Sequence, residues 1–301
     1  MSSDISHTSI TADPQVHDPF RERTAWSQGR RIRVGDVELW CHDTGGDGEV
    51  ILLLGGFTAG HFVFDFVRRH LPGYRLVTWE PRGLGESDRP DPVAHPYSTD
   101  IWAADLMGLL QALDIDRAHV WADGFGGYIA LRLAAEHPEV VTSLITSTEV
   151  WAGFEDRSKN WNIYSAIVNN LGTTGRGARL LAKWMDVETL PWFVSWESRN
   201  VEDVLHLETV DATVGYGLLR ADVRADLPRV KSPTMVMLGG VSGGSVSDDP
   251  ALEEMRANIE DLRVHVVDQA HVSYSVVTHP QECASVARAF FESHAMAKPA
   301  R

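Results

Sequence analysis

The sequence is poor in cysteine and has no long apolar run. Its 301 residues include two cysteines, Cys41 and Cys283, too few for a disulfide framework or a cysteine-based metal site. Such a low content is typical of a reducing compartment, and we expect the cytoplasm. No window reaches the roughly 18 apolar residues that a membrane span needs. Residues 1–14 show neither the basic nor the apolar segment of a secretory signal, so we expect none.

Basic residues are scarce relative to acidic ones. The formal net charge is −15, whereas nucleic acids and anionic membranes attract basic patches. The sequence therefore argues against both as partners, and solubility is the simplest role for the acidity. Neither a metal-ligand spacing nor a dinucleotide fingerprint occurs, so we expect no metal and no cofactor. The expected partner is a small molecule, and a homodimer is left open.

The residues that are present alternate between short apolar runs and helical patterns. Hydrophobic residues make up 44% and charged residues 23% of the chain, as in ordinary globular proteins. Strands that alternate with helices of ten to fifteen residues predict an α/β fold with a mostly parallel, helix-covered sheet. The expected strands are 31–34, 37–42, 50–54, 75–79, 118–122, 140–147, 234–238 and 263–267. The expected helices are 99–113, 127–136, 250–261 and 280–293, with one more around 62–67.

Three segments differ in composition. Residues 1–28 are polar and without period, and we expect an N-terminal arm. The α/β core is expected over 29–149 and 224–301. Between its two parts, residues 150–223 are rich in tryptophan, helical in patches and without strand runs. We interpret this insertion as a helical lid over the edge of the sheet.

The chain is organised around Val120–Leu131, where an apolar run ends in a glycine-rich turn and a helical pattern begins. Such a strand–turn–helix elbow needs small residues two before and two after its apex. Ala122 and Gly126 meet this need if the apex is Gly124. Centring the turn on Asp123 would place aromatic residues at both crowded positions. We therefore expect Gly124 at the apex, with Asp123 pointing toward neighbouring helices in a structural role.

Four motifs, taken in order, resemble those of the α/β-hydrolase fold in its lid-bearing branch. The resemblance covers about residues 30–295. The first motif resembles the oxyanion segment, in which the residue at Gly55 is usually His. The second resembles an Asp-x-Arg-Gly-x-Gly-x-Ser loop with Glu in place of Asp. The motifs are Leu54-Gly55-Gly56-Phe57, the loop 80–87, Ala122-Asp123-Gly124-Phe125-Gly126-Gly127, and Asp268-Gln269-Ala270-His271.

The resemblance implies a Ser-His-Asp type of site, and this chain departs from it. Gly124 has no side chain, so no covalent intermediate can form at the apex. The usual acid position reads Ser242. Of the three groups, the histidine remains, as His271, which suits general-base work near neutral pH. Glu149 is the best candidate partner for His271, although it could equally be a solvated or capping residue.

Two further aspartates compete with Glu149. Asp248 and Asp249 could partner His271 only if their glycine- and serine-rich loop folds back.

The resemblance also implies an oxyanion hole made by the backbone N–H groups of Phe57 and Phe125, which does not depend on the lost side chains. Gly55 and Gly56 are expected to line the substrate site beside it. Tryptophans of the expected lid would line a cavity for an apolar or aromatic ligand, unless they form only a small helical core. These tryptophans are Trp151, Trp184 and Trp192.

Three hypotheses follow. The first is an enzyme in which His271 acts as a base without a covalent intermediate: a lyase, an isomerase or cyclase, a cofactor-free oxygenase, or a hydrolase that uses an activated water. The resemblance includes cofactor-free dioxygenases and hydroxynitrile lyases, which carry out such chemistry on this fold. The second is a non-catalytic ligand-binding protein. The third is an ordinary hydrolase whose nucleophile has been replaced by Gly124.

Overall fold

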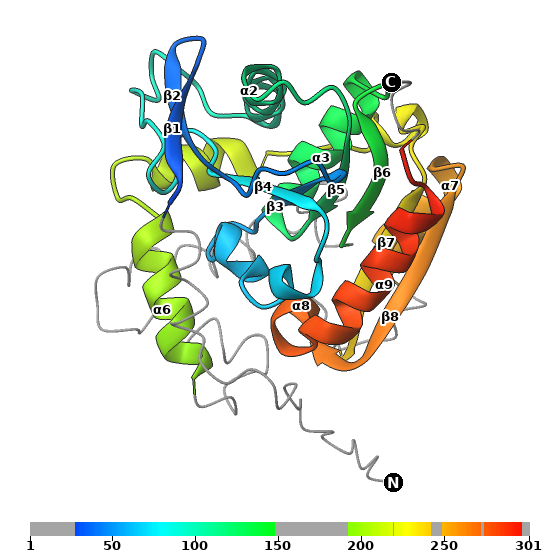
Figure 1. Cartoon of the computed structure of the whole chain (residues 1–301). Helices are drawn as coiled ribbons and strands as arrows, with labels where there is room; N and C mark the ends of the chain where they lie inside the picture. The colour runs from blue at the N-terminus through cyan, green and yellow to red at the C-terminus, as the bar shows by residue number, and fades with distance from the viewer. Residues whose placement is uncertain (1–27, 148–191, 219, 242–248, 272–273, 297–301) are drawn as a thin grey trace, which may run out of the picture.

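The computed structural model describes residues 28–147, 192–218, 220–241, 249–271 and 274–296 (Figure 1). Within them, eight strands form one sheet in the order β1-β2-β4-β3-β5-β6-β7-β8. Strand β2 pairs antiparallel with β1 and β4, and the other neighbours are parallel. The strands are β1 (Arg30–Val34), β2 (Val37–Asp43), β3 (Val50–Leu54), β4 (Arg75–Trp79), β5 (Ala118–Ala122), β6 (Val141–Thr146), β7 (Thr234–Val241) and β8 (Leu262–His271).

Helices cover both faces of this sheet (Figure 1). The helical elements are η2 (His61–Phe64), η3 (Arg68–His70), α2 (Thr99–Ala112), α3 (Phe125–Glu136), α6 (Phe193–Val204), η4 (Asp211–Leu218), η5 (Leu227–Arg229), α7 (Pro250–Asn258), α8 (Ser275–Thr278) and α9 (Pro280–Ser293). Helices α2 and α3 pack on one face, whereas η2, η3 and α9 pack on the other.

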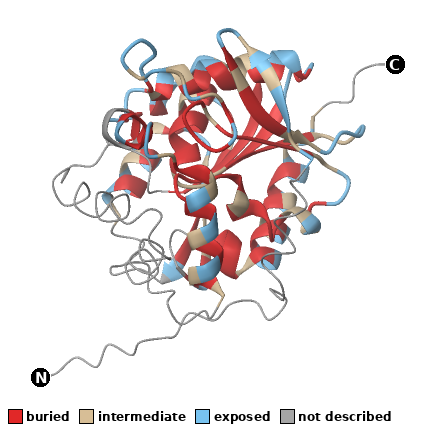
Figure 2. Ribbon diagram, turned by 90° about the vertical axis from the view of Figure 1, so that its left-hand side faces the viewer, coloured by how far each residue is buried: buried red, intermediate tan, exposed pale blue. Residues whose placement is uncertain are grey.

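Strand periodicity assigns the core residues to these two faces. Successive side chains of a strand point to opposite sides. Leu52 and Leu54 of β3 therefore join the cluster under α2 and α3, whereas Ile51 and Leu53 join the cluster under α9. Every residue of β3 is buried, as its uninterrupted apolar sequence predicts for a central parallel strand. Figure 2 shows that the middle of the sheet is buried.

Two expectations were wrong in detail. The helix expected around residues 62–67 is two short 3-10 helices, η2 and η3, with i to i+3 bonds such as Asp65 N–H to Phe62 O. His271, which follows the expected strand 263–267 by four residues, is the last residue of β8. The strand is longer than its apolar run because β7 and β8 keep pairing past a register shift, as far as Val241 and His271.

The expected division into arm, core and lid stays a prediction. Residues 1–27 and 148–191 lie outside the described residues, so most of the arm and of the lid is not described. The described part of 150–223 contains α6 and η4. In the part of the chain that the structure describes, no helix combines the length and apolar character of a membrane span.

Candidate active site

The elbow joins β5 to α3 through Asp123 and Gly124. Gly124 has φ +50° and ψ −122°, a backbone conformation that residues with a Cβ rarely adopt. Two residues later the helix backbone comes so close to β3 that a Cβ on Gly126 would lie 2.2 Å from the Leu54 carbonyl oxygen. Glycine at 126 is therefore a packing requirement.

Packing does not require a glycine at 124. Among the described atoms, a Cβ there would meet only the Cα of Gly56, at 3.5 Å, which is an ordinary van der Waals contact. The apex of the elbow therefore has room for a side chain that this sequence does not supply.

The segment after β3 folds back on itself beside the elbow. Gly56 and Gly60 form a β-bridge, and a Cβ on Gly55 would lie 1.8 Å from the Gly60 carbonyl oxygen. Position 55 thus has no room for the histidine that is usual there in proteins with the α/β-hydrolase motifs. The rings of Phe57 and Phe125 are both buried and lie edge to face, with centroids 6.1 Å apart. The two residues expected to form the oxyanion hole are therefore neighbours.

The position of the Phe125 N–H, at the start of α3, suits it to donate a hydrogen bond to a ligand. Phe125 is the first residue of α3, and the first N–H groups of a helix have no partner within it. Such groups attract negative charge.

The sequence-based expectation that Asp123 points toward neighbouring helices in a structural role stays a prediction; burial raises the pKa of the Cys283 thiol in α9, and the Asp123 charge helps to raise it. The Asp123 Oδ2 lies 3.3 Å from the position that a Cβ of Gly56 would take, so the carboxylate is beside the oxyanion segment. Its charge also reaches Tyr274. Burial raises the pKa of the Tyr274 hydroxyl well above its ordinary value, and the carboxylates of Glu197 and Asp123 raise it further.

His271 is placed only through its backbone. It pairs with Val241 at the end of β8, and its side chain lies outside what the structure describes. Three residues later, the Tyr274 hydroxyl lies 3.3 Å from Thr58 Oγ1, next to Phe57. The chain that leaves His271 therefore returns to the oxyanion segment.

A buried polar network, absent from the sequence analysis, joins three elements near this segment. The Tyr274 hydroxyl donates to Glu197 Oε1 at 3.2 Å, and its single proton leaves Thr58 as the donor to Tyr274. All three side chains are buried. No local pattern signals this network, because its members come from the oxyanion segment, α6 and the segment after β8.

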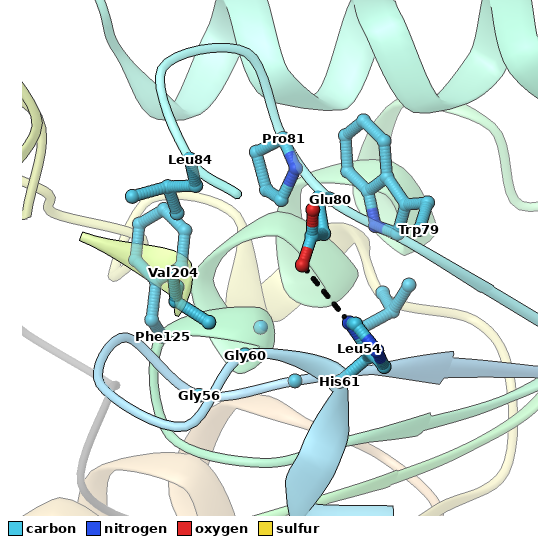
Figure 3. Close-up of a pocket in the computed structure, with 12 residues that line it drawn as sticks. Leu54, Gly56, Gly60, His61, Trp79, Glu80, Pro81, Leu84, Phe125 and Val204 are labelled. Atoms are coloured by element: carbon cyan, nitrogen blue, oxygen red, sulfur yellow. Dashed lines mark ion pairs between the residues drawn. The ribbon is translucent and has the colours of Figure 1, made fainter. Parts of the chain in front are cut away.

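A second unexpected pair is His61 and Glu80 (Figure 3). His61 Nδ1 lies 3.1 Å from Glu80 Oε1, and the side chains are 3% and 5% exposed. The imidazole stacks on Trp40, with centroids 4.6 Å apart. Glu80 Oε2 also accepts the Glu86 N–H at 2.6 Å. The only sequence signal for this pair is the Glu that replaces the usual Asp of the 80–87 loop.

His61 and Glu80 line a small cavity together with parts of the oxyanion segment and the elbow. Its free volume is about 10 Å³, close to what one water molecule needs. Other lining residues are Gly55, Gly56, Gly60, Phe125, Gly126 and Val204.

Several predicted site residues are not brought to this place. Glu149, Trp151, Trp184 and Asp248 lie outside the described residues, as does Ser242. Trp192 packs against Phe66 and Trp196, with centroids 5.6 and 6.2 Å away, as a core residue would. Asp249 caps α7 by accepting the Ala251 N–H at 2.8 Å. Among the described side chains, no three His, Cys, Asp or Glu residues form a group that could hold a metal ion.

Comparison with known proteins supports the fold. The family model of the alpha/beta hydrolase fold matches residues 49–156. A 2-hydroxy-6-oxo-2,4-heptadienoate hydrolase of Pseudomonas putida is 32% identical over 133 residues, 42% of this chain and 46% of that protein. The chain thus spans less than half the length of this relative. A 3-oxoadipate enol-lactonase of Acinetobacter baylyi is 25% identical over 229 residues, 73% of this chain and 79% of that protein.

Solved structures show the same architecture. The enol-lactonase from Burkholderia xenovorans LB400 superposes with a TM-score of 0.69 at 19% identity, covering 87% of this chain and 100% of that one. At this identity the likeness speaks for the fold alone. The protein therefore has the α/β-hydrolase fold, and the family model and the relatives support its membership of the α/β-hydrolase superfamily.

Proposed function

We propose that the protein is an enzyme that acts on a small apolar or aromatic carbonyl or hydroxyl compound without forming a covalent intermediate. One observation carries the proposal. The elbow has its strained apex and room for a side chain, but Gly124 offers no nucleophile. The neighbouring backbone donors of Phe57 and Phe125 are independent of that loss.

In the proposed mechanism, His271 is the general base. It takes a proton from water, from a substrate hydroxyl or from an activated C–H group. The oxyanion or enolate that forms is held by the Phe57 and Phe125 N–H groups, which require no reorganisation during the reaction. The protonated imidazole then returns the proton to the product. This scheme accommodates a lyase, an isomerase or cyclase, a cofactor-free oxygenase and a water-mediated hydrolase.

The sheet topology and one contact support the placement of a base at this edge of the sheet. Strands β5 and β8 are parallel members of one sheet, so Gly124, just after β5, and His271, the last residue of β8, lie at the same edge. Tyr274 then links the segment after His271 to Thr58 in the oxyanion segment. Glu149 is proposed as the group that orients His271, because it follows β6 by a few residues.

The names of the relatives support the substrate class. One relative is named for hydrolysis of a hydroxy-oxo-dienoate and another as an enol-lactonase. Both names describe small carbonyl compounds with an enol or hydroxyl group. A base and an oxyanion hole suit such compounds, since their reactions pass through enolates or tetrahedral oxyanions.

The test is turnover of a panel of aryl esters, enol-lactones and vinylogous diketones by His271→Ala. Loss of a general base is expected to lower kcat by at least about 100-fold. His137→Ala, at the exposed end of α3, is the matched control and is expected to keep full activity. Unchanged turnover in His271→Ala would refute the mechanism.

A non-catalytic binding protein is the second candidate, favoured by the same glycine at the apex. Such a protein would be stabilised thermally by panel compounds without converting them. Product formation by the wild type, lost in His271→Ala, would exclude this candidate.

A further inference from the structure

The buried face of α6 combines apolar residues with two polar ones. Glu197 and Asn200 are both fully buried. The other buried residues of α6 are Phe193, Trp196, Val201 and Val204. A helix face that served only packing would be apolar throughout, because buried polar groups cost free energy unless they are hydrogen-bonded.

Asn200 is unusual even among these. Its side-chain oxygen and nitrogen are both buried, and neither has a hydrogen-bond partner within the described structure. The indole N–H of Trp196, one turn earlier, is in the same state. A buried side-chain amide without hydrogen-bond partners is rare in native proteins and calls for a physical explanation. A group of a bound ligand is one that would satisfy both atoms.

Helix geometry places Asn200 over the oxyanion segment. Residues three and four apart share one face of a helix. Val204, four residues later, lines the small cavity with Gly56 and Phe125 (Figure 3). Glu197, three residues earlier, accepts the Tyr274 hydroxyl, which in turn contacts Thr58. Asn200 lies between these two contacts, on the face that covers residues 55–60.

We propose that Asn200 and Glu197 form a recognition site for an uncharged, hydroxyl- or amide-bearing group of the ligand. This inference rests on the proposed function, because it assumes that the space beside the oxyanion segment binds the substrate. The Asn200 amide both donates and accepts, which matches a hydroxyl or an amide.

The carboxylates near Asn200 disfavour binding of an anionic ligand. The Glu197 carboxylate lies one turn from Asn200, and a second carboxylate, Asp123, lies beside Gly56. A negatively charged group brought between them would be repelled in a poorly solvated environment. The Tyr274 proton is already donated to Glu197 and the Thr58 proton to the Tyr274 oxygen, so neither can offset this repulsion. The preferred ligand therefore differs from the carboxylates for which the two relatives are named.

The first experiment measures the melting temperature of the full chain without ligand. Asn200→Leu approximately keeps the side-chain volume and removes the polar atoms that lack hydrogen-bond partners. Tm is therefore expected to rise by about 2 °C or more. Thr213→Val is the matched control: Thr213 is also buried, but its hydroxyl donates to the Thr209 carbonyl at 3.1 Å. Its Tm is expected to fall. A fall in Asn200→Leu as well would show that the fold needs the amide and would overturn the proposal.

The second experiment measures binding of three para-substituted acetophenones by thermal shift and calorimetry. 4-Hydroxyacetophenone is expected to bind wild type more tightly than 4-methylacetophenone or 4-acetylbenzoate. In Asn200→Leu, its affinity is expected to drop about tenfold, to the level of the methyl analogue, as loss of a buried hydrogen bond predicts. Equal binding of the hydroxyl and methyl compounds, or preference for the benzoate, would contradict the proposal.

These measurements do not depend on catalysis. Binding selectivity without any turnover would keep the recognition site and remove the enzymatic proposal. Turnover lost in His271→Ala but unselective binding would do the reverse.

Discussion

Replacing Gly124 with serine adds a Cβ and a hydroxyl at the apex of the elbow. Within the described part of the chain, the added Cβ would touch only the Gly56 Cα, at 3.5 Å, so these residues contribute no steric overlap. The cost is conformational, since φ is +50° and ψ is −122°. A residue with a Cβ in such a region loses about 1–2 kcal/mol. Restricting the unfolded chain returns about 0.4–1 kcal/mol.

The expected net loss for Gly124→Ser is therefore about 1 kcal/mol, small beside the 5–15 kcal/mol typical of a folded domain. Gly126→Ser is the matched control on the same turn. Its Cβ would overlap the Leu54 carbonyl oxygen at 2.2 Å and the Leu54 carbonyl carbon at 2.6 Å. Neither atom belongs to a movable side chain, so we expect a loss above about 4 kcal/mol or no folding.

Urea denaturation measures both variants, and pre-steady-state release of 4-nitrophenol from 4-nitrophenyl acetate measures the chemistry. Gly124→Ser is expected to give a burst of about one product per protein, because a serine beside a base forms an acyl-enzyme. Wild type is expected to give none. Equal destabilisation of the two variants would refute the geometry of the elbow. Full, sustained esterase turnover in Gly124→Ser would instead show an ordinary hydrolase with a replaced nucleophile.

Three further predictions concern the buried polar groups around this site and at one strand end. His61→Ala removes the ion-pair partner of a buried carboxylate, Glu80, and should lower the free energy of unfolding measured in urea by about 2–4 kcal/mol. The control, Arg256→Ala, breaks an exposed ion pair with Glu253 and should lower it by less than about 1 kcal/mol. Equal losses would refute the importance of burial. Tyr274→Phe should cost about 1–3 kcal/mol because the Glu197 carboxylate loses a donor, and no change in the urea midpoint would contradict the network. At Asp43, burial opposes ionisation, but the hydrogen bonds from Arg75 and the charges nearby outweigh it and lower the pKa below its ordinary 3.8. The stabilisation is thus present above about pH 4 and lost as pH falls further; the stability difference between wild type and Asp43→Asn should shrink below pH 4, and a difference that grew would reverse the assigned sign.

The sequence predicts most of the sheet because its signals are local. The strands β3, β4 and β5 match the expected ranges residue for residue, since apolar runs of five residues bounded by turns mark buried parallel strands. The elbow is equally local, because its close approach demands small residues at fixed positions. The end of β8 is different: whether pairing continues to His271 depends on β7, some thirty residues earlier.

The polar contacts of the site could not be predicted, because they join residues far apart in sequence. Glu197 is 77 residues from Tyr274, and Tyr274 is 216 residues from Thr58. None of the three stands in a motif, and an acidic residue in an amphipathic helix normally faces solvent. The position of the Asp123 carboxylate beside Gly56 is equally non-local, since it depends on the approach of the segment that follows another strand.

The distribution of buried polar groups argues that this edge of the sheet is used. Glu197, Asn200, His61 and Glu80 are all at least nine-tenths buried, and each costs desolvation free energy. Well-packed apolar residues at such positions are often as stable or more stable. These four residues lie around the oxyanion segment, on η2, on α6 and after β4. Departures from apolar packing are expected at functional sites. Gly124 offers no side chain at the apex of the elbow, yet buried polar groups surround the neighbouring oxyanion segment, which agrees with the proposed binding and proton-transfer role of this edge.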